Sequence, residues 1–359
     1  MSETQKSEAI LPKASAFDIP SMTVSGPPIR SIREYPSPPP QFANLEIVGQ
    51  KWRENYKEVF RRNTAILPQS FIFKARNAIV FKNGFIQSEE GIQVIEALPY
   101  GNATPIDLEV VETYGKPSVL LRKHGDSNYG HWLIELCTRI QYFKTLFPND
   151  QWDVIVSYNP AELKQIRIDS LAWLGIDENR IKWADYRPRV FQELYFITSN
   201  SIHSHTHDAA ALLNLRDCAL QRSREISKGP RLFVARRSSL RRRILNEESV
   251  LDLCKKFGLN VIFPEEFNLD EQVSIFSHAE IIVGISGAAL TNILFAPKNC
   301  NILALTPNQG FELFFWDIAN IVGQKFSFLF GESTSPQDGS HSDFVIDTNI
   351  LEQWLKTAG

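Results

Sequence analysis

The sequence predicts an α/β protein built from two Rossmann-like halves that face each other across a central cleft. The chain has 359 residues, which gives a prior of two domains at ~150 residues each. Short apolar runs alternate with longer helix-like segments, which is the pattern of a parallel sheet with helical connections. This alternation occurs twice, and a helix-like, then polar stretch at residues 215–230 separates the two occurrences.

Composition excludes several classes of protein. The chain is 43% hydrophobic and 22% charged, with a formal net charge of -3. This is ordinary globular usage, and a dedicated nucleic-acid binder would usually be basic. The four cysteines lie far apart and form no CxxC pair, which favours buried thiols in a reducing compartment over disulfides or a zinc site. They are Cys137, Cys218, Cys254 and Cys300.

The chain shows no segment expected to enter or cross a membrane. Its start, MSETQKSEAI, has no apolar core that could serve as a signal peptide. The longest uncharged apolar run, residues 281–297, falls short of the ~20 apolar residues that span a bilayer. We therefore expect a soluble, cytoplasmic protein with no transmembrane segment, and peripheral contact with the inner face of a membrane stays open.

Residues 1–45 are expected to form a Pro-rich arm. Eight of the 20 prolines fall in this stretch, and no regular apolar period accompanies them. Such composition is typical of an extended or disordered segment.

Residues 46–220 predict the first half. Asn83-Gly84 between two apolar runs indicates a hairpin. Strands are expected at residues 78–81, 85–86, 153–156 and 193–197, and helices at 129–147 and 161–174.

Residues 221–340 predict the second half, with five strands and four connecting helices. The expected strands are 231–235, 260–263, 280–283, 301–305 and 326–329, and the helices are 246–257, 269–279, 288–295 and 311–322. The last segment, 341–359, contains an amphipathic stretch at residues 350–355 that could pack back on the first half.

A first group of polar residues lies where the helix at residue 129 begins. Asp126 and Asn128 can cap that helix with side-chain oxygens. His131 and Glu135 are four residues apart and share a helix face. A carboxylate beside an imidazole fixes its tautomer and raises its basicity, which suits a general base. The alternative is a capped helix with a structural histidine.

A second group is the basic run at residues 236–243, directly after the first strand of the second half. Ligands of open α/β sheets bind at the carboxyl ends of strands, and arginine makes two charge-assisted bonds to phosphate. Asn246 could cap the next helix. The alternative is a solvated basic loop.

A third group is the turn at residues 283–292, VGISGAALTN, between a buried strand and a helix. Small residues let a ligand approach the backbone, and exposed amides at a helix start attract anions. Tight packing of strand against helix would produce the same pattern.

Three alternate histidines, His203, His205 and His207, would point the same way in an extended segment, as zinc ligands do. A polar loop that lines the cleft is the favoured reading. No two aspartates are separated by a single residue, so the DxD pattern that holds a divalent metal with a sugar nucleotide is absent. We expect no metal and no other cofactor.

Three stretches together resemble glycosyltransferase family 61. They are residues 128–132 (NYGHW), 236–247 (RRSSLRRRILNE), and 271–272 with 279–292 (AEIIVGISGAALTN). The similarity covers roughly residues 115–330, in family order, and has a bacterial-type pattern. One position departs: Ser286 stands where many members have a histidine, and a serine cannot act as a cation or strong base there.

The resemblance implies a GT-B arrangement and inverting, metal-independent transfer from a nucleotide sugar to a glycan or lipid-linked glycan hydroxyl. In this reading His131, oriented by Glu135, or else Asp126, removes the acceptor proton. The expected acceptor-binding residues are Asn128, Tyr129 and Trp132. The expected donor-binding residues are Arg236, Arg242, Arg243, Asn246, Glu265, Glu266, Gly284, Ser286, Gly287, Ala288 and Asn292.

Two rival functions stay open. One is a nucleotide- or glycan-binding protein without turnover, in which Ser286 marks lost catalysis. The other is a nucleotide-sugar epimerase of the same architecture, which would need no acceptor.

Overall fold

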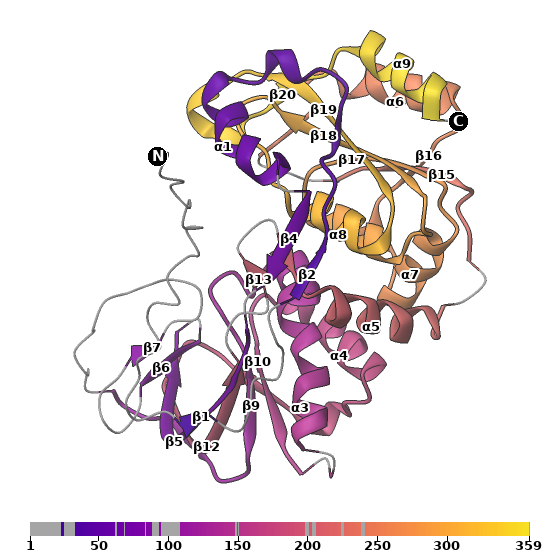
Figure 1. Cartoon of the computed structure of the whole chain (residues 1–359). Coiled ribbons are helices and arrows are strands. Elements are labelled where there is room, and N and C mark those ends of the chain that lie inside the picture. The colour runs from indigo at the N-terminus through magenta and orange to yellow at the C-terminus, as the bar shows by residue number, and fades with distance from the viewer. Residues whose placement is uncertain are drawn as a thin grey trace, which may run out of the picture.

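Within the residues that it describes, the computed structural model contains two large β-sheets with helices packed between them, and two short two-stranded sheets (Figure 1). It describes residues 23–24, 33–61, 63–67, 69–82, 84–87, 93–94, 108–147, 149, 151–197, 201–202, 206–223, 226–237 and 241–358.

Within the described residues, the first sheet has nine strands and mixes parallel with antiparallel pairs. β9, β10 and β11 pair in parallel, and β12 pairs in parallel with β9 but antiparallel with β5. The antiparallel β5–β6 pair confirms the hairpin predicted at Gly84. The strands are β1 (Thr23–Val24), β5 (Ile72–Phe81), β6 (Phe85–Gln87), β7 (Gln93–Val94), β8 (Glu112–Tyr114), β9 (Ser118–Leu121), β10 (Asp153–Ser157), β11 (Ile181–Ala184) and β12 (Arg189–Ile197).

The second sheet confirms the alternation predicted for the second half. Five parallel strands lie in the order β16-β15-β17-β18-β19, and short strands β20 and β3 pair with β19. Numbered along the chain this is 2-1-3-4-5, so the order reverses between β15 and β17. The strands are β3 (Gln41–Phe42), β15 (Arg231–Val234), β16 (Asn260–Ile262), β17 (Ile281–Ile285), β18 (Asn301–Pro307), β19 (Lys325–Ser333) and β20 (Phe344–Val345).

The described part of the Pro-rich segment packs against both halves. β2 (Arg33–Pro36) pairs with β4 (Thr64–Leu67), and β3 adds to the edge of the second sheet. The indole of Trp316 donates to the carbonyl of Pro38 over 2.9 Å. Residues 33–42 thus follow an extended course across the molecule.

A further two-stranded sheet lies outside both large sheets. It pairs β13 (Ser201–Ile202) with β14 (Thr206–His207).

The helical segments follow the prediction with local differences. The expected helix at 129–147 is a continuous run of α2, a π-helical η2, a 3-10 helical η3 and α3, and the predicted helix at 288–295 is 3-10. The predicted linker begins inside α5. The segments are η1 (Leu45–Ile47), α1 (Gln50–Arg61), α2 (Tyr129–His131), η2 (Trp132–Leu136), η3 (Cys137–Arg139), α3 (Ile140–Leu146), η4 (Ala161–Leu163), α4 (Lys164–Trp173), η5 (Glu178–Arg180), α5 (Ala209–Leu220), α6 (Glu247–Lys256), η6 (Pro264–Glu266), α7 (Leu269–Ser277), η7 (Ala288–Phe295), α8 (Phe314–Val322), η8 (Pro336–His341) and α9 (Thr348–Ala358).

The C-terminal helix does not pack back on the first half, so that prediction was wrong. Leu351 and Leu355 of α9 are buried with Val250 and Cys254 of α6 in a core beneath the second sheet. The two leucines lie one turn apart, and their apolar stripe covers the face of the sheet that α6 leaves open.

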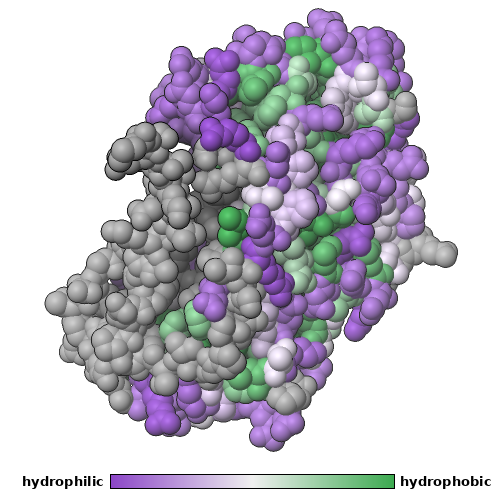
Figure 2. All heavy atoms as spheres, viewed as in Figure 1, coloured by the Kyte–Doolittle hydropathy of each residue, from purple (hydrophilic) through white to green (hydrophobic). Residues whose placement is uncertain are grey.

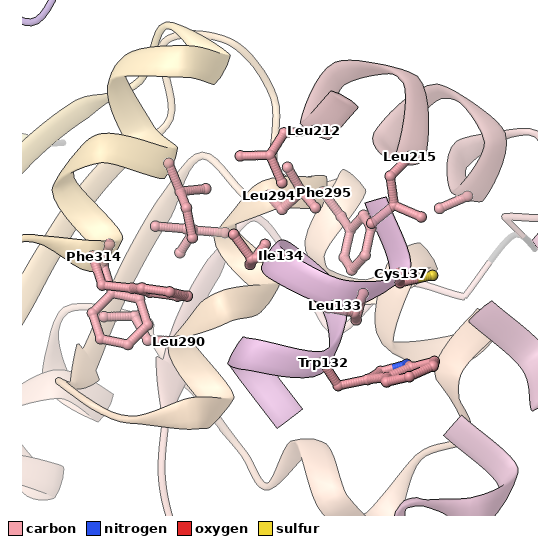
Figure 3. Packing of buried hydrophobic residues seen from close by; sticks show 14 of the residues in the cluster. Trp132, Leu133, Ile134, Cys137, Leu212, Leu215, Leu290, Leu294, Phe295 and Phe314 are labelled. Carbon is pink, nitrogen blue, oxygen red and sulfur yellow. The ribbon is translucent and has the colours of Figure 1, made fainter. Parts of the chain in front are cut away.

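The other face of the second sheet shares one apolar core with the first sheet. This core joins Val154 of β10 to Ile302 of β18 through the helices between them. Figure 3 shows side chains from η2, α5, η7 and α8 meeting there. At ~25 cal/mol per Å² of buried apolar area, such a continuous core resists separation of the two halves.

The face of the molecule drawn in Figure 2 is mainly polar where it is coloured, with apolar residues in scattered patches. Within the described ranges, every helix is too short or too polar to span a bilayer.

Helical segments of the two halves come close together at Gly130. A Cβ atom built there would lie 2.8 Å from Oγ1 of Thr291 on η7, so α2 and η7 touch where only glycine fits. Next to it, the Tyr129 hydroxyl donates to Oδ1 of Asn292 over 2.6 Å, and the Asn292 amide donates to Gln272 over 2.8 Å.

We expect Gly130→Ala to destabilise the protein by about 1–3 kcal/mol, because overpacking forces α2 away from η7. Gly49→Ala is the control, since the nearest atom to its Cβ, in Trp52, lies 3.8 Å away. Urea unfolding measures both. Equal stability of the two variants would contradict close packing at Gly130.

Candidate active site

Arg236 lies at the point where the strand order of the second sheet reverses. It follows the carboxyl end of β15, and its half-buried guanidinium covers the turn after β17. A Cβ atom built on Gly287 would lie 3.3 Å from Nη1 of Arg236, so the glycine lets the guanidinium approach the backbone. Ligands of open α/β sheets bind at this position.

Arg242 reaches the same turn from the basic loop. Its Nη1 donates to the carbonyl of Ser286 over 2.8 Å, and its Nη2 lies 3.8 Å from Glu312. Burial, followed by the charge of Arg242, lowers the pKa of Arg236, whereas Glu265 opposes the shift. Two guanidinium groups are therefore close enough to repel each other, and an anion between them would relieve that repulsion.

Arg243 does not join this pair. Its guanidinium is bonded to the carboxylate of Asp343 at 2.6 and 2.9 Å, and 62% of its side chain is exposed. Arg242 and Arg243 were both predicted to bind the donor with Arg236, and of these two the structure places only Arg242 at the turn.

The turn itself presents small, buried groups. The Ser286 side chain is 2% exposed, and within the described part of the chain its hydroxyl has no hydrogen-bond partner. Gly284 is buried inside β17, and Ala288 begins η7. A buried hydroxyl without a partner is costly, and a ligand in the turn would satisfy it.

The remaining predicted donor residues have partners of their own. Asn246 stands at the N-cap position of α6 but makes no capping bond, so that prediction was wrong; its amide exchanges two bonds with the backbone of Ile346. Glu266 pairs with the Arg237 guanidinium, and Glu265 accepts from the Arg237 backbone over 3.1 Å. Glu265 and Glu266 lie after the carboxyl end of β16, beside β15.

A buried charged cluster follows the carboxyl end of β9. Glu135 is 1% exposed, and its Oε2 is contacted by both His131 Nδ1, at 3.0 Å, and the ammonium of Lys123. An ionised carboxylate can only accept, so His131 Nδ1 carries the proton and a neutral imidazole has Nε2 free to accept one. The His131 side chain is 29% exposed, so it can meet an acceptor.

The surroundings keep Glu135 ionised. Burial alone raises its pKa, but the hydrogen bond from His131 and the charges of Lys123, His131 and His207 outweigh burial and hold the pKa of Glu135 far below its usual range. Because the folded pKa lies below the value of about 4.3 in the unfolded chain, this carboxylate stabilises the fold at neutral pH. That contribution is lost as the pH falls through the folded pKa.

Only one of the two predicted caps forms. Asn128 accepts from the amides of Gly130 and His131 at 2.8 and 3.3 Å. Asp126 makes no capping bond, so that prediction was wrong. Its carboxylate is buried 3.5 Å from Arg122, and burial raises the pKa of Asp126 despite that charge.

Two of the predicted binding residues, Trp132 and Asn292, are buried in the packing between helices, and Tyr129 is partly buried there. Trp132 is fully buried, and its indole donates to Ser170 over 2.9 Å. Tyr129 and Asn292 bond to each other across the contact between the halves. These three side chains therefore hold neighbouring helical segments together.

A second histidine–carboxylate pair lies beside the first. His207 Nδ1 is 2.7 Å from Asp317, and both side chains are fully buried. The Phe314 ring stands edge-on to both His131 and His207, with centroids 5.8 and 4.7 Å away. His203 and His205 lie outside the described residues, and within those residues no group of three or more His, Cys, Asp or Glu side chains could hold a metal ion.

Sequence reasoning missed Lys123 and Asp317. Lys123 is twelve residues before its partner Glu135, and Asp317 comes from the other half of the molecule. No local spacing rule connects such pairs. The structure combines a turn whose arginines suit an anion with a histidine that is held by a buried carboxylate. These groups suit the movement of a proton and the stabilisation of a departing anion.

Residues 129–303 match the family model described as Glycosyltransferase 61. Two curated relatives from Oryza sativa subsp. japonica are similar over shorter stretches. Alpha-1,3-arabinosyltransferase XAT3 is 26% identical over 87 residues, which cover 23% of this chain and 15% of the relative. Alpha-1,3-arabinosyltransferase XAT2 is 30% identical over 93 residues, which cover 24% of this chain and 16% of the relative. The match thus spans under a fifth of the length of either relative.

We expect Lys123→Met to destabilise the protein by about 3–5 kcal/mol, because it leaves the buried Glu135 carboxylate without its cation. Lys116→Met is the control: Lys116 also pairs with an acid, Asp153 at 2.8 Å, but 46% of its side chain is exposed. The control should lose less than about 1 kcal/mol. Urea unfolding at pH 7 measures the free energy of unfolding of both variants. Similar losses of stability in the two would show that the buried Lys123–Glu135 pair contributes no more than the exposed Lys116–Asp153 pair.

Proposed function

Residues 129–303 of this chain belong to glycosyltransferase family 61, and on that premise we propose that the protein transfers a sugar from a nucleotide-sugar donor to an acceptor hydroxyl. The observation that carries the proposal is the arginine pair at the turn after β17. Arg236 covers Gly287 while Arg242 holds the Ser286 carbonyl.

The arginine pair is proposed to bind the donor diphosphate. As the bond to the sugar breaks, negative charge grows on the leaving diphosphate, and fixed guanidinium groups stabilise charge where it develops. This is the work that a divalent metal does in other transferases, so we propose metal-independent transfer. Backbone amides near Ala288 and the Ser286 hydroxyl are suited to donate further hydrogen bonds to the diphosphate. The Glu265 carboxylate is suited to accept a hydrogen bond from a ribose hydroxyl.

His131 is proposed as the general base. Its Nδ1 is held by Glu135 at 3.0 Å, so Nε2 can take the proton of the acceptor hydroxyl as the oxygen attacks the anomeric carbon. Attack on the face opposite the diphosphate inverts the configuration. His131 and Gly287 follow strands of different sheets, and the contact of α2 with η7 brings their segments together.

The two plant relatives are named as arabinosyltransferases, and we therefore propose a pentosyl donor for this chain. A glycan or lipid-linked glycan is the proposed acceptor, and the cytoplasm, or the inner membrane face, is the proposed location.

Arg236→Ala should weaken binding of nucleoside diphosphates by about tenfold or more. The reason is that the variant loses a charge-assisted hydrogen bond, which contributes about 1.5 kcal/mol or more. Arg243→Ala is the matched control, because Arg243 lies in the same basic loop but pairs with Asp343. Calorimetry with uridine and guanosine diphosphates measures both variants. Equal affinity for the two variants would remove the arginine pair from the donor site.

His131→Gln should lower kcat about 10²-fold or more while diphosphate affinity changes less than twofold, because the base acts on the acceptor. Turnover is measured as nucleoside diphosphate released in the presence of acceptor. Near-normal turnover in His131→Gln, with loss in Asp126→Asn, would move the role of base to Asp126. Diphosphate binding without turnover of any donor would instead favour a binding protein.

A further inference from the structure

The C-terminal segment 341–346 is joined to the basic loop by backbone bonds. The Arg242 amide donates to the carbonyl of His341 over 3.2 Å, and the Phe344 amide donates to the carbonyl of Arg243 over 2.9 Å. The Leu245 amide then donates to Phe344 over 2.9 Å. This pairing fixes His341, the last residue of η8, beside the arginine that reaches the turn after β17.

The side chains of Arg242 and His341 are also in contact. Nη2 of Arg242 lies 3.4 Å from Nδ1 of His341. A guanidinium can only donate, so Nδ1 must accept and the ring proton of the neutral imidazole lies on Nε2. His341 is exposed, so a ligand bound beside Arg242 can reach its imidazole ring.

We propose that His341 is a further contact for the donor diphosphate: when the anion binds, Nη2 of Arg242 turns from Nδ1 of His341 to the anion, Nδ1 takes up a proton, and the Nε2–H of His341 donates to the anion. This rests on the proposed function, which places the diphosphate at Arg236 and Arg242. The residue lies beyond the family match at 129–303, so the loop between β19 and β20 would complete the anion site.

The charges around His341 explain the proton uptake. Its pKa is lowered first by burial and then by the charges of Arg242 and Arg241, while Glu312 and Asp338 oppose the shift. A depressed pKa leaves the imidazole neutral without ligand. A bound diphosphate adds negative charge beside the two arginines, raises the pKa of His341 and so draws a proton from solution.

Calorimetry of inorganic pyrophosphate at pH 6.5, in two buffers of different ionisation enthalpy, measures the protons taken up on binding. Pyrophosphate itself also exchanges protons when it binds. This contribution is the same for the wild type and His341→Gln, so the difference between the two proteins reports on His341. We expect the full-length wild-type chain to take up more protons than His341→Gln, and His341→Ala to bind about tenfold more weakly, as for loss of a hydrogen bond to a charged group.

His278→Gln is the control, because His278 is also exposed but precedes the amino end of β17, at the opposite edge of the sheet. It should match the wild type. Equal proton uptake by wild type and His341→Gln overturns the role of His341; if Arg236→Ala still weakens binding, the proposed donor site stands. Pyrophosphate binding that is absent, or unaffected by Arg236→Ala, overturns both.

Discussion

The structure depends on the contact between α2 and η7, where Gly130 lies against Thr291 and Tyr129 bonds to Asn292. Each element follows a parallel strand of a different sheet, so their contact fixes the ends of β9 and β17 relative to each other. A side chain at residue 130 would separate them. The residues that resemble the family pattern therefore serve first to hold the two halves in one rigid arrangement, and the proposed site depends on that arrangement.

Electrostatics then divides the site into two parts of opposite character. At the turn after β17, Arg236 and Arg242 lie near each other, with partial compensation from Glu312 and Glu265. Beside β9, the buried Glu135 carboxylate is compensated by Lys123 and hydrogen-bonded by His131. The first part has positive charge to offer an anion, and the second has a fixed imidazole that can accept a proton. The proposed transfer of a sugar from a diphosphate to a hydroxyl uses both parts.

The sequence predicted what local patterns determine. The alternation of strands and helices in residues 231–329 is confirmed, as is the hairpin at Gly84, because apolar period and turn residues act within a few positions. Contacts between distant segments were not predictable. Nothing local shows that Arg243 pairs with Asp343 while Arg242 turns inward, or that Lys123 compensates Glu135. The packing of α9 on α6 was missed for the same reason, since an amphipathic stripe does not reveal its partner.

In the proposed reaction, one ligand contacts both halves of the molecule near the junction of α2 and η7. A crystal structure of the chain with a bound nucleotide sugar, or a non-hydrolysable analogue, tests this most directly. We expect the diphosphate to lie against Arg236 and Arg242, with the anomeric carbon directed toward His131. A diphosphate bound away from the Gly287 turn, or a sugar directed away from His131, would contradict it.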